Sequence, residues 1–305
     1  MSSPALLIYN PRAGRWTLPS LVDPVAAVLA ERGEAIEVRA TEGTGHATEL
    51  ARRAVAAGAP TIYAFGGDGT LRETAAGMLG AAVPLGALPG GTTNVVVRAL
   101  GLPIRPLAAA RALVEAEPRP LDVGLCNGEP FLMQVSAGLD AVALARVHLG
   151  WKRILGRTAV AAVGFATWLR YRCPQLELTA DGHPLQATFF GICNLPLYGG
   201  PFRLAPEARP DDSRLDLVLF RGDTRGATLA FALDLVRGRH VARADTSFFQ
   251  VEEIRLPERP LQAQLDGDPR LLRGAVVRLA DEPLTVLAPR GRQSPSRNSA
   301  NDTRT

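Results

Sequence analysis

The first third of the chain alternates short apolar segments with stretches in which apolar residues recur at helical spacing. The apolar segments predict β-strands over residues 5–9, 35–39, 61–65 and 83–88. Helical spacing predicts helices over residues 18–32 and 47–57, a third that ends near Leu79 and a fourth that ends at Gly101. Strands that alternate with helices in this way are typical of a parallel sheet covered by crossover helices.

The pattern changes beyond Pro118 and Pro120. Short segments of alternating apolar and polar residues follow at 131–135, 176–179, 188–193 and 215–220, with helical stretches near 151–171 and 226–236. Such segments are typical of antiparallel sheets. We therefore predict an N-terminal three-layer α/β domain over residues 1–122 and a largely antiparallel β-sandwich domain over residues 123–290. Residues 291–305 are rich in Ser, Arg and Asn without an apolar period, and we expect a disordered tail there.

The composition narrows the class of protein. Of the 305 residues, 47% are apolar, which excludes disorder for most of the chain. The longest apolar run, residues 159–169, is too short to cross about 30 Å of hydrocarbon, and the run at 5–9 is too short for a secretory signal. These features predict a soluble, cytoplasmic protein. No zinc site or disulfide framework is expected, because metal-ligand and CxxC spacings are absent among Cys126, Cys173, Cys193, His46, His148, His183 and His240.

Two Gly-rich loops follow consecutive predicted strands. They are Gly66-Gly67-Asp68-Gly69-Thr70 and Pro89-Gly90-Gly91-Thr92-Thr93-Asn94. In an open α/β sheet, loops at the carboxyl ends of the strands form the ligand crevice, and glycines let backbone N–H groups approach phosphate oxygens. Asp68 would repel phosphates unless it reached a bridging Mg²⁺. The alternative is a plain strand-to-helix connection.

With these loops, the chain resembles the diacylglycerol kinase catalytic-domain family, and within it the bacterial soluble lipid kinases. The first loop is similar to the nucleotide-binding signature that these enzymes share with sphingosine kinases, NAD kinases and phosphofructokinases. The resemblance covers residues 5–288. Further segments match in order: Asn10-Pro11-Arg12-Ala13-Gly14, Leu88 to Asn94, Ser136-Ala137-Gly138-Leu139-Asp140, Asn194 with Tyr198-Gly199-Gly200, Leu204-Ala205-Pro206, Pro210 to Asp216 and Gln264-Leu265-Asp266-Gly267-Asp268.

The resemblance implies roles for individual residues. The nucleotide site would comprise Asn10, Thr41, Gly66, Gly67, Asp68, Gly69, Thr70, Thr92 and Asn94. Asp68 would act in catalysis through phosphate-bound Mg²⁺, and Asp266 would be the general base that accepts the proton of the lipid hydroxyl. Asp268 would support it. Without the family, the sequence favours a simpler interpretation of Asp266, as a turn residue before Gly267.

A structural Mg²⁺ site is also implied in the second domain. Asp212 would hold it with the carbonyl groups of Arg209 and Arg214, whereas the same residues also describe a simple loop before a strand. The chain departs from the family in three places. Asp268 stands where Glu is usual, Val95 where an acidic residue is common, and Ser213 where Gly is frequent.

The implied activity is ATP-dependent transfer of the γ-phosphate to a hydroxyl of a lipid such as diacylglycerol. The implied partners are a lipid substrate and, by transient peripheral contact, a membrane surface, and not nucleic acid. The net charge of +4 favours anionic surfaces. Membrane-facing candidates, or simply residues of a solvated helix face, are Trp151, Lys152, Arg153, Arg157, Trp168, Arg170, Tyr171 and Arg172.

Two other functions stay open. One is a kinase of a soluble acceptor such as NAD, and the other is a catalytically silent lipid-binding member of the fold. Several lipids carry a suitable hydroxyl, so the sequence does not identify the acceptor. It does not predict the oligomeric state either.

Overall fold

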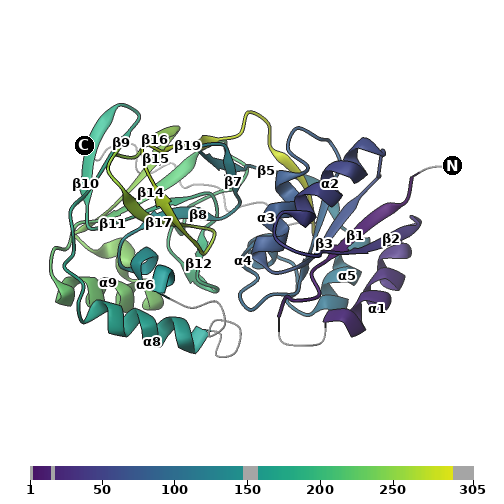
Figure 1. Ribbon diagram of the computed structural model, residues 1–305, viewed down its shortest axis with the longest axis horizontal. Coiled ribbons are helices and arrows are strands. Elements are labelled where there is room, and N and C mark those ends of the chain that lie inside the picture. The colour runs from purple at the N-terminus through teal and green to yellow at the C-terminus, as the bar shows by residue number, and fades with distance from the viewer. Residues whose placement is uncertain (1–2, 15–17, 147–156, 291–305) are drawn as a thin grey trace.

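The protein forms two domains that lie side by side (Figure 1). The computed structural model describes residues 3–14, 18–146 and 157–290. The predicted tail and the candidates Trp151, Lys152 and Arg153 lie outside these residues, as does the Arg157 side chain. Among the described helices, none is both long enough and apolar enough to cross a membrane.

The first domain is built on a six-stranded sheet with the order β2-β1-β3-β4-β20-β5. Its strands are β1 (Ala5–Tyr9), β2 (Ile36–Ala40), β3 (Ile62–Gly66), β4 (Leu85–Pro89), β5 (Glu117–Leu121) and β20 (Leu284–Ala288). The pairs among β1 to β4 are parallel. Every residue of β3 and β4 is buried, which is expected of a parallel sheet covered on both faces.

Helices cover the two faces of this sheet, so the domain has three layers (Figure 1). Helix α1 packs against α5, and α2 packs against α3. The helices are α1 (Leu18–Ala30), α2 (His46–Ala56), α3 (Asp68–Ala76), α4 (Val95–Ala99) and α5 (Pro106–Val114). The sheet and helices enclose one core, to which the buried Tyr63, Phe65 and Met78 belong.

The second domain is a sandwich of two six-stranded sheets. One has the order β10-β9-β16-β19-β6-β7 and the other β15-β14-β11-β8-β17-β18. All described neighbours in both sheets are antiparallel. The strands are β6 (Gly124–Cys126), β7 (Glu129–Phe131), β8 (Gln134–Ala137), β9 (Leu176–Ala180), β10 (His183–Ala187), β11 (Phe189–Cys193), β14 (Leu215–Phe220), β15 (Thr246–Val251), β16 (Glu253–Arg255), β17 (Leu261–Leu265), β18 (Asp268–Leu272) and β19 (Val276–Leu279).

The remaining elements lie on the outside of this sandwich. Helix α9 (Arg225–Arg237) packs Phe231 and Leu235 onto Val218 and Phe220 of the second sheet. The others are α6 (Leu139–Arg146), α8 (Arg157–Trp168), the 3₁₀ helix η1 (His240–Ala242) and the hairpin of β12 (Leu197–Tyr198) and β13 (Phe202–Arg203).

The predicted fold class is confirmed, and two elements differ from their prediction. Residues 284–288, which we assigned to the second domain, form β20 in the first sheet, where β20 pairs with β4 and β5. The strand predicted over residues 131–135 is instead two strands, β7 and β8, with Leu132 and Met133 between them. The chain therefore crosses between the domains twice.

Candidate active site

The loops predicted to bind phosphate lie together at one edge of the first sheet. Asn10 and Thr41 follow β1 and β2, and the Gly-rich loops follow β3 and β4. Because these strands are parallel, all four segments emerge at the same edge. Asn10 Nδ2 donates a hydrogen bond to Thr70 Oγ1 at 3.3 Å. Thr41 is buried, and its backbone N–H donates to the Tyr9 carbonyl.

The two Gly-rich loops touch through their backbones. The Gly90 N–H donates to the Gly66 carbonyl at 2.7 Å. A Cβ atom on Gly91 would lie 2.7 Å from the Cα of Gly67, which is closer than Cβ atoms approach other atoms. A Cβ on Gly66 would lie 2.5 Å from the Thr70 side chain. Glycine is therefore required at 91 and 66 for the loops to pack. Gly69 and Thr92 are exposed beside this contact.

Asp68 ties the first loop to the second. Its Oδ1 accepts a hydrogen bond from the Val96 N–H at 3.1 Å, and its Oδ2 accepts one from Thr93 Oγ1 at 3.0 Å. Asp68 is also the first residue of α3, where a negative charge is favourable. Asp68 as a residue is only partly buried beside the two Gly-rich loops. Thr93 was not predicted from the sequence as the partner of Asp68.

Asn94 and Val95 support the second loop from within. Asn94 adopts a left-handed conformation with φ of 47°. Its side-chain oxygen accepts from the Gly91 N–H at 2.8 Å, and its side-chain nitrogen donates to the Gly91 carbonyl at 3.0 Å. Val95 is buried in the core of the first domain, so its departure from the family pattern does not alter the exposed surface of the loop.

The Asp266-Gly267 turn of the second domain faces this region. Both residues have positive φ, 50° and 85°, and they join β17 to β18 in a two-residue hairpin loop. Asp and Gly tolerate these angles best, which explains the sequence of the turn. Asp268 is the first residue of β18.

The Asp266 side chain is buried, and its carboxylate binds the backbone of the segment between β7 and β8. It accepts hydrogen bonds from the backbone N–H groups of Leu132, Met133 and Gln134, at 2.8, 2.9 and 2.9 Å. Leu132 and Met133 lie in the break between β7 and β8, so their N–H groups donate to Asp266 and not to a neighbouring strand. Burial raises the pKa of Asp266 to about 6, while the three N–H groups and the Arg72 charge act in the opposite direction.

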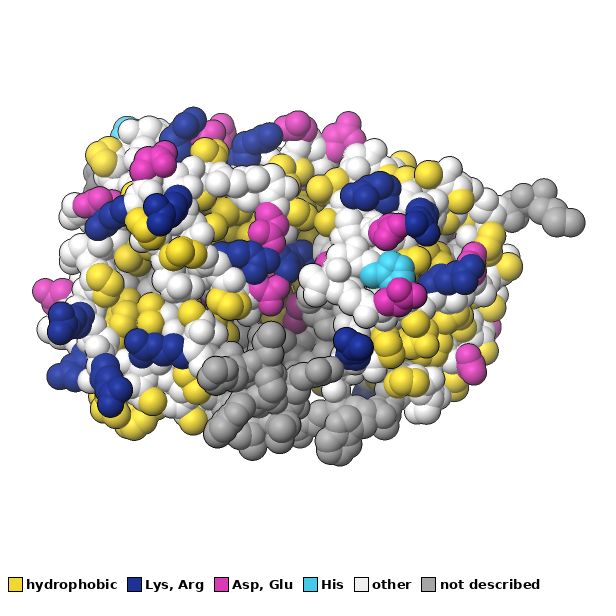
Figure 2. Space-filling model, viewed as in Figure 1, with side chains coloured by type: hydrophobic (Ala, Val, Ile, Leu, Met, Phe, Trp, Pro, Cys, Tyr) yellow, Lys and Arg dark blue, Asp and Glu magenta, His cyan; other side chains and the backbone are white. Residues whose placement is uncertain are grey.

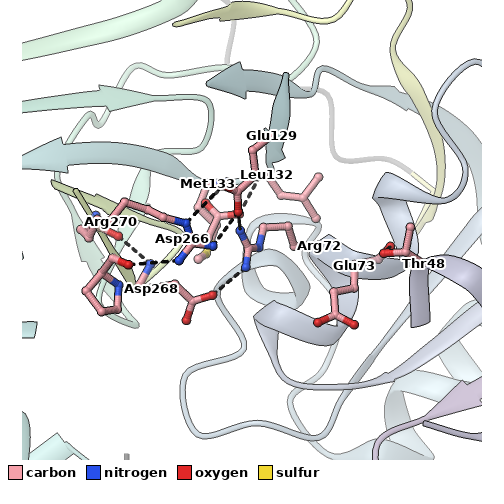
Figure 3. Close-up of polar contacts among 12 residues, drawn as sticks. Thr48, Arg72, Glu73, Glu129, Leu132, Met133, Asp266, Asp268 and Arg270 are labelled. Atoms are coloured by element: carbon pink, nitrogen blue, oxygen red, sulfur yellow. Dashed lines mark hydrogen bonds and ion pairs between the residues drawn. The ribbon is translucent and has the colours of Figure 1, made fainter. Parts of the chain in front are cut away.

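Arg72 joins the two domains (Figure 3). It lies on α3, four residues after Asp68, and its side chain is only 10% exposed. Its Nη2 is 2.6 Å from Asp268 Oδ2, and its Nη1 is 2.8 Å from Glu129 Oε1. Arg270 also pairs with Glu129, and mainly because of that hydrogen bond the pKa of Glu129 is lowered. The Asp268 side chain is 44% exposed, in contrast to Asp266.

The sequence patterns did not predict Arg72, Glu129 and Arg270 as residues of this site. Their partners are distant in the sequence, and charged residues on helices and strands are usually solvated. One signal was present for Arg72, because its spacing from Asp68 places both on one face of α3.

A chain of hydrogen bonds extends from the turn into the second domain. The Gly267 N–H donates to Gln264 Oε1, and Gln264 Nε2 donates to Ser136 Oγ at 2.6 Å. Ser136 and Tyr198 both donate to Asp140 Oδ2. Burial raises the pKa of Asp140, against the lowering effect of these hydrogen bonds. These hydrogen bonds connect three segments that matched the family pattern, and they stabilise the Asp266-Gly267 turn.

The predicted metal loop is a compact polar turn. Asp212 Oδ1 accepts from the Arg214 N–H at 3.2 Å, and Arg209 pairs with Asp211. Ser213 has φ of 57°, a left-handed value that explains why glycine is frequent at this position. In the described part of the chain, no three His, Cys, Asp or Glu residues gather as metal ligands. The site on Asp212 and backbone carbonyls remains a prediction.

Comparison with known proteins identifies the family. Residues 4–126 match the diacylglycerol kinase catalytic domain, and residues 133–288 match the YegS C-terminal NAD kinase beta sandwich-like domain. A "Probable lipid kinase YegS-like" from Pseudomonas aeruginosa strain UCBPP-PA14 is 34% identical over 277 residues, covering 87% of this chain and 89% of the relative. A diacylglycerol kinase from Bacillus subtilis strain 168 is 28% identical, with the same coverage of both chains.

Solved structures agree on the fold. A crystal structure of a diacylglycerol kinase from Bacillus anthracis strain Sterne superposes with a TM-score of 0.69 at 21% identity, covering 93% of this chain and 96% of that one. A second crystal structure from the same organism gives a TM-score of 0.80 at 24% identity, covering 93% and 95%. From these matches and the site described above, the chain belongs to the family of YegS-like lipid kinases and diacylglycerol kinases.

Proposed function

We propose that the chain is an ATP-dependent lipid kinase that transfers the γ-phosphate to a hydroxyl of a lipid such as diacylglycerol. One observation carries the proposal. The helix that begins at Asp68, in the phosphate loop of the first domain, holds Arg72 against Asp268 of the second domain at 2.6 Å. The Gly-rich loops, which we propose bind phosphate, and a partly exposed carboxylate therefore lie on opposite sides of the domain boundary, which supports transfer between two bound substrates.

The first domain would hold the nucleotide. Backbone N–H groups of the two Gly-rich loops, the Thr70 and Thr92 hydroxyls and the start of α3 supply donors and positive potential for phosphate oxygens. Asp68 fits Mg²⁺, because this partly buried aspartate lies beside these loops and Mg²⁺ in such sites takes one or two carboxylates along with phosphate oxygens. A bound Mg²⁺ would neutralise charge on the phosphates.

The second domain would supply the general base. The resemblance to the family implies this role for Asp266, with Asp268 in support. The geometry favours the reverse. Asp266 is 8% exposed and its carboxylate already accepts three backbone N–H groups, whereas Asp268 is accessible and lies against Arg72. We assign proton acceptance from the lipid hydroxyl to Asp268, and the positioning of the turn to Asp266.

A kinase of a soluble acceptor such as NAD is the second candidate. The match of residues 133–288 to an NAD kinase beta sandwich-like domain favours it. A catalytically silent lipid-binding protein is the third, and it would bind lipid without transferring phosphate.

One experiment separates these functions. The purified protein is incubated with γ-labelled ATP, Mg²⁺ and either NAD or lipids with a free hydroxyl, dispersed in mixed micelles. The lipid panel contains diacylglycerol, phosphatidylglycerol, ceramide and a sphingoid base. We expect label in at least one lipid and none in NAD. Label in NAD alone would establish the second candidate, and no label in any acceptor would contradict the proposed activity.

A further inference from the structure

Exposed apolar side chains gather on one part of the second domain. Among the described residues, ten large apolar side chains are exposed, and Ile104 and Leu271 are the two that lie elsewhere. The other eight lie on or directly beside α8, α9, η1 and β15: Phe165, Leu169, Leu229, Leu233, Val236, Val241, Phe248 and Phe249. Large apolar side chains that cluster in this way mark a surface that another body covers.

Helix α9 is apolar on both of its faces. Its inner face buries Thr228, Phe231 and Leu235. Its outer face presents Leu229, Leu233 and Val236, which are 37%, 44% and 58% exposed. Because their spacings are four and three residues, they form one stripe along the helix. A helix that only covers a sheet needs no apolar stripe toward solvent.

The neighbouring elements extend this stripe. Trp168 Nε1 of α8 donates to the Arg225 carbonyl at 2.8 Å, and Arg225 Nη1 donates back to the Leu169 carbonyl. The exposed Phe165 and Leu169 therefore lie beside the start of α9. At its other end, α9 contacts η1, whose exposed Val241 follows His240. We call the exposed residues within 165–172 and 221–245 the docking face.

The docking face is strongly basic. Residues 165–172 and 221–245 contain seven arginines and three aspartates, so this small part of the chain carries an excess of positive charge as large as the net +4 of the whole chain. Two of these aspartates, Asp234 and Asp245, pair with Arg243, and the other arginines lie outside that pair of contacts. Arg237 and Arg239 are exposed at the end of the α9 stripe. Figure 2 shows hydrophobic and basic side chains side by side at the lower left, where α8 and α9 lie in Figure 1.

We propose that the docking face binds the surface of an anionic lipid bilayer. The stripe of α9 would enter the boundary between headgroups and acyl chains, and the arginines around it would contact lipid phosphates. Charge complementarity favours this occupant, because the face combines apolar side chains with an arginine excess that an anionic surface matches. The inference rests on the proposed function, since an enzyme whose acceptor is a lipid must meet the membrane. It adds the surface that makes the contact.

The test compares three variants of the full chain. The first is Leu229→Gln with Leu233→Gln, and the second is Arg237→Ser with Arg239→Ser. The matched control is Ile104→Gln with Arg52→Ser, an exposed apolar and an exposed basic residue of the first domain. Each protein is sedimented with vesicles of phosphatidylcholine alone or with 30% phosphatidylglycerol, at low and high salt. Kinase activity is measured on a short-chain diacylglycerol dissolved as monomers.

We expect wild-type protein and control to bind the anionic vesicles, and to bind them less at high salt. The leucine variant should bind about tenfold more weakly, and the arginine variant about fivefold more weakly for each arginine removed. Activity on the monomeric lipid should be unchanged in all variants. The inference would be overturned if both variants still bound the anionic vesicles as wild type does. It would also be overturned if the substitutions changed the oligomeric state of the protein and left vesicle binding unchanged. A wild-type protein that binds vesicles through this face but phosphorylates no lipid would contradict the proposed function alone.

Discussion

Arg72 of α3 and Asp268 of β18 form an ion pair across the domain boundary, with 2.6 Å between Nη2 and Oδ2. The same guanidinium reaches Glu129 of β7 at 2.8 Å. Only a forked side chain holds both carboxylates at once. This arginine therefore helps to align the Gly-rich loops with the Asp266-Gly267-Asp268 hairpin, together with Leu132 and Met133, which pack into the core of the first domain.

Arg72→Lys should keep the charge but lose this alignment. We expect kcat to fall on the order of tenfold while the KM for ATP changes little, because the phosphate loops themselves are intact. The free energy of unfolding should fall by about 1–2 kcal/mol, since the side chain is buried but both carboxylates are partly exposed. Steady-state kinetics and urea unfolding check this. Arg290→Lys, on an exposed pair with Glu117, is the control and should change neither.

Two glycines of the phosphate loops should respond oppositely to alanine. Gly91→Ala places a Cβ atom 2.7 Å from the Cα of Gly67, so the loops must separate, at a cost of about 1–3 kcal/mol. Gly69→Ala meets no atom within 4 Å and lies in α3, where alanine stabilises a helix by up to about 1 kcal/mol. Thermal unfolding of both variants measures this. A Gly91→Ala protein as stable as wild type would contradict the described loop contact.

Asp68→Asn should separate the charge of Asp68 from its structural role. The amide can still accept from the Val96 N–H and can donate to Thr93 Oγ1, so the loops should stay tethered. Without the carboxylate, Mg²⁺-dependent phosphate transfer should fall by at least about 10²-fold. Thr93→Val is the reverse control, because it removes one tether and keeps the charge. If Asp68→Asn were as active as wild type at limiting Mg²⁺, Asp68 would have no part in metal binding.

The fold could be predicted because its signals are local. Continuous apolar strands followed by glycines specify a parallel sheet and its binding edge without long-range information. Residues 284–288 were assigned to the wrong domain because their sequence does not indicate that the chain returns to the first sheet as β20. The Arg72 pairs span 57 and 196 residues, and the hydrogen bond that breaks the predicted strand at Leu132 spans 134. The spacing of apolar residues along the sequence carries no information about contacts between residues that are so far apart in it.

The buried Asp266 should make stability depend on pH. Its pKa is about 6 in the folded protein and near 3.8 when unfolded, so the folded state binds the extra proton between these values. The free energy of unfolding should therefore fall as the pH rises from 4 to 6, and level off above 7. Urea unfolding at several pH values checks this against Asp266→Asn, in which this contribution is absent. The same dependence in both proteins would assign the titration to another group.

The role of Asp268 as the base that accepts the proton of the lipid hydroxyl is tested most directly by the turnover of Asp268→Asn on the best acceptor lipid. Nucleotide affinity and thermal stability are measured beside it, with Asp266→Asn for comparison. A positioned base contributes about 10² to 10⁴ in rate. We predict that Asp268→Asn loses this factor while it binds ATP as wild type does, and that its free energy of unfolding falls by no more than the about 1–2 kcal/mol expected from weakening the Arg72 pair. Asp266→Asn should lose activity together with more stability. Wild-type turnover in Asp268→Asn would contradict the account, and a selective loss of turnover in a fully stable Asp266→Asn protein would return the role of base to Asp266.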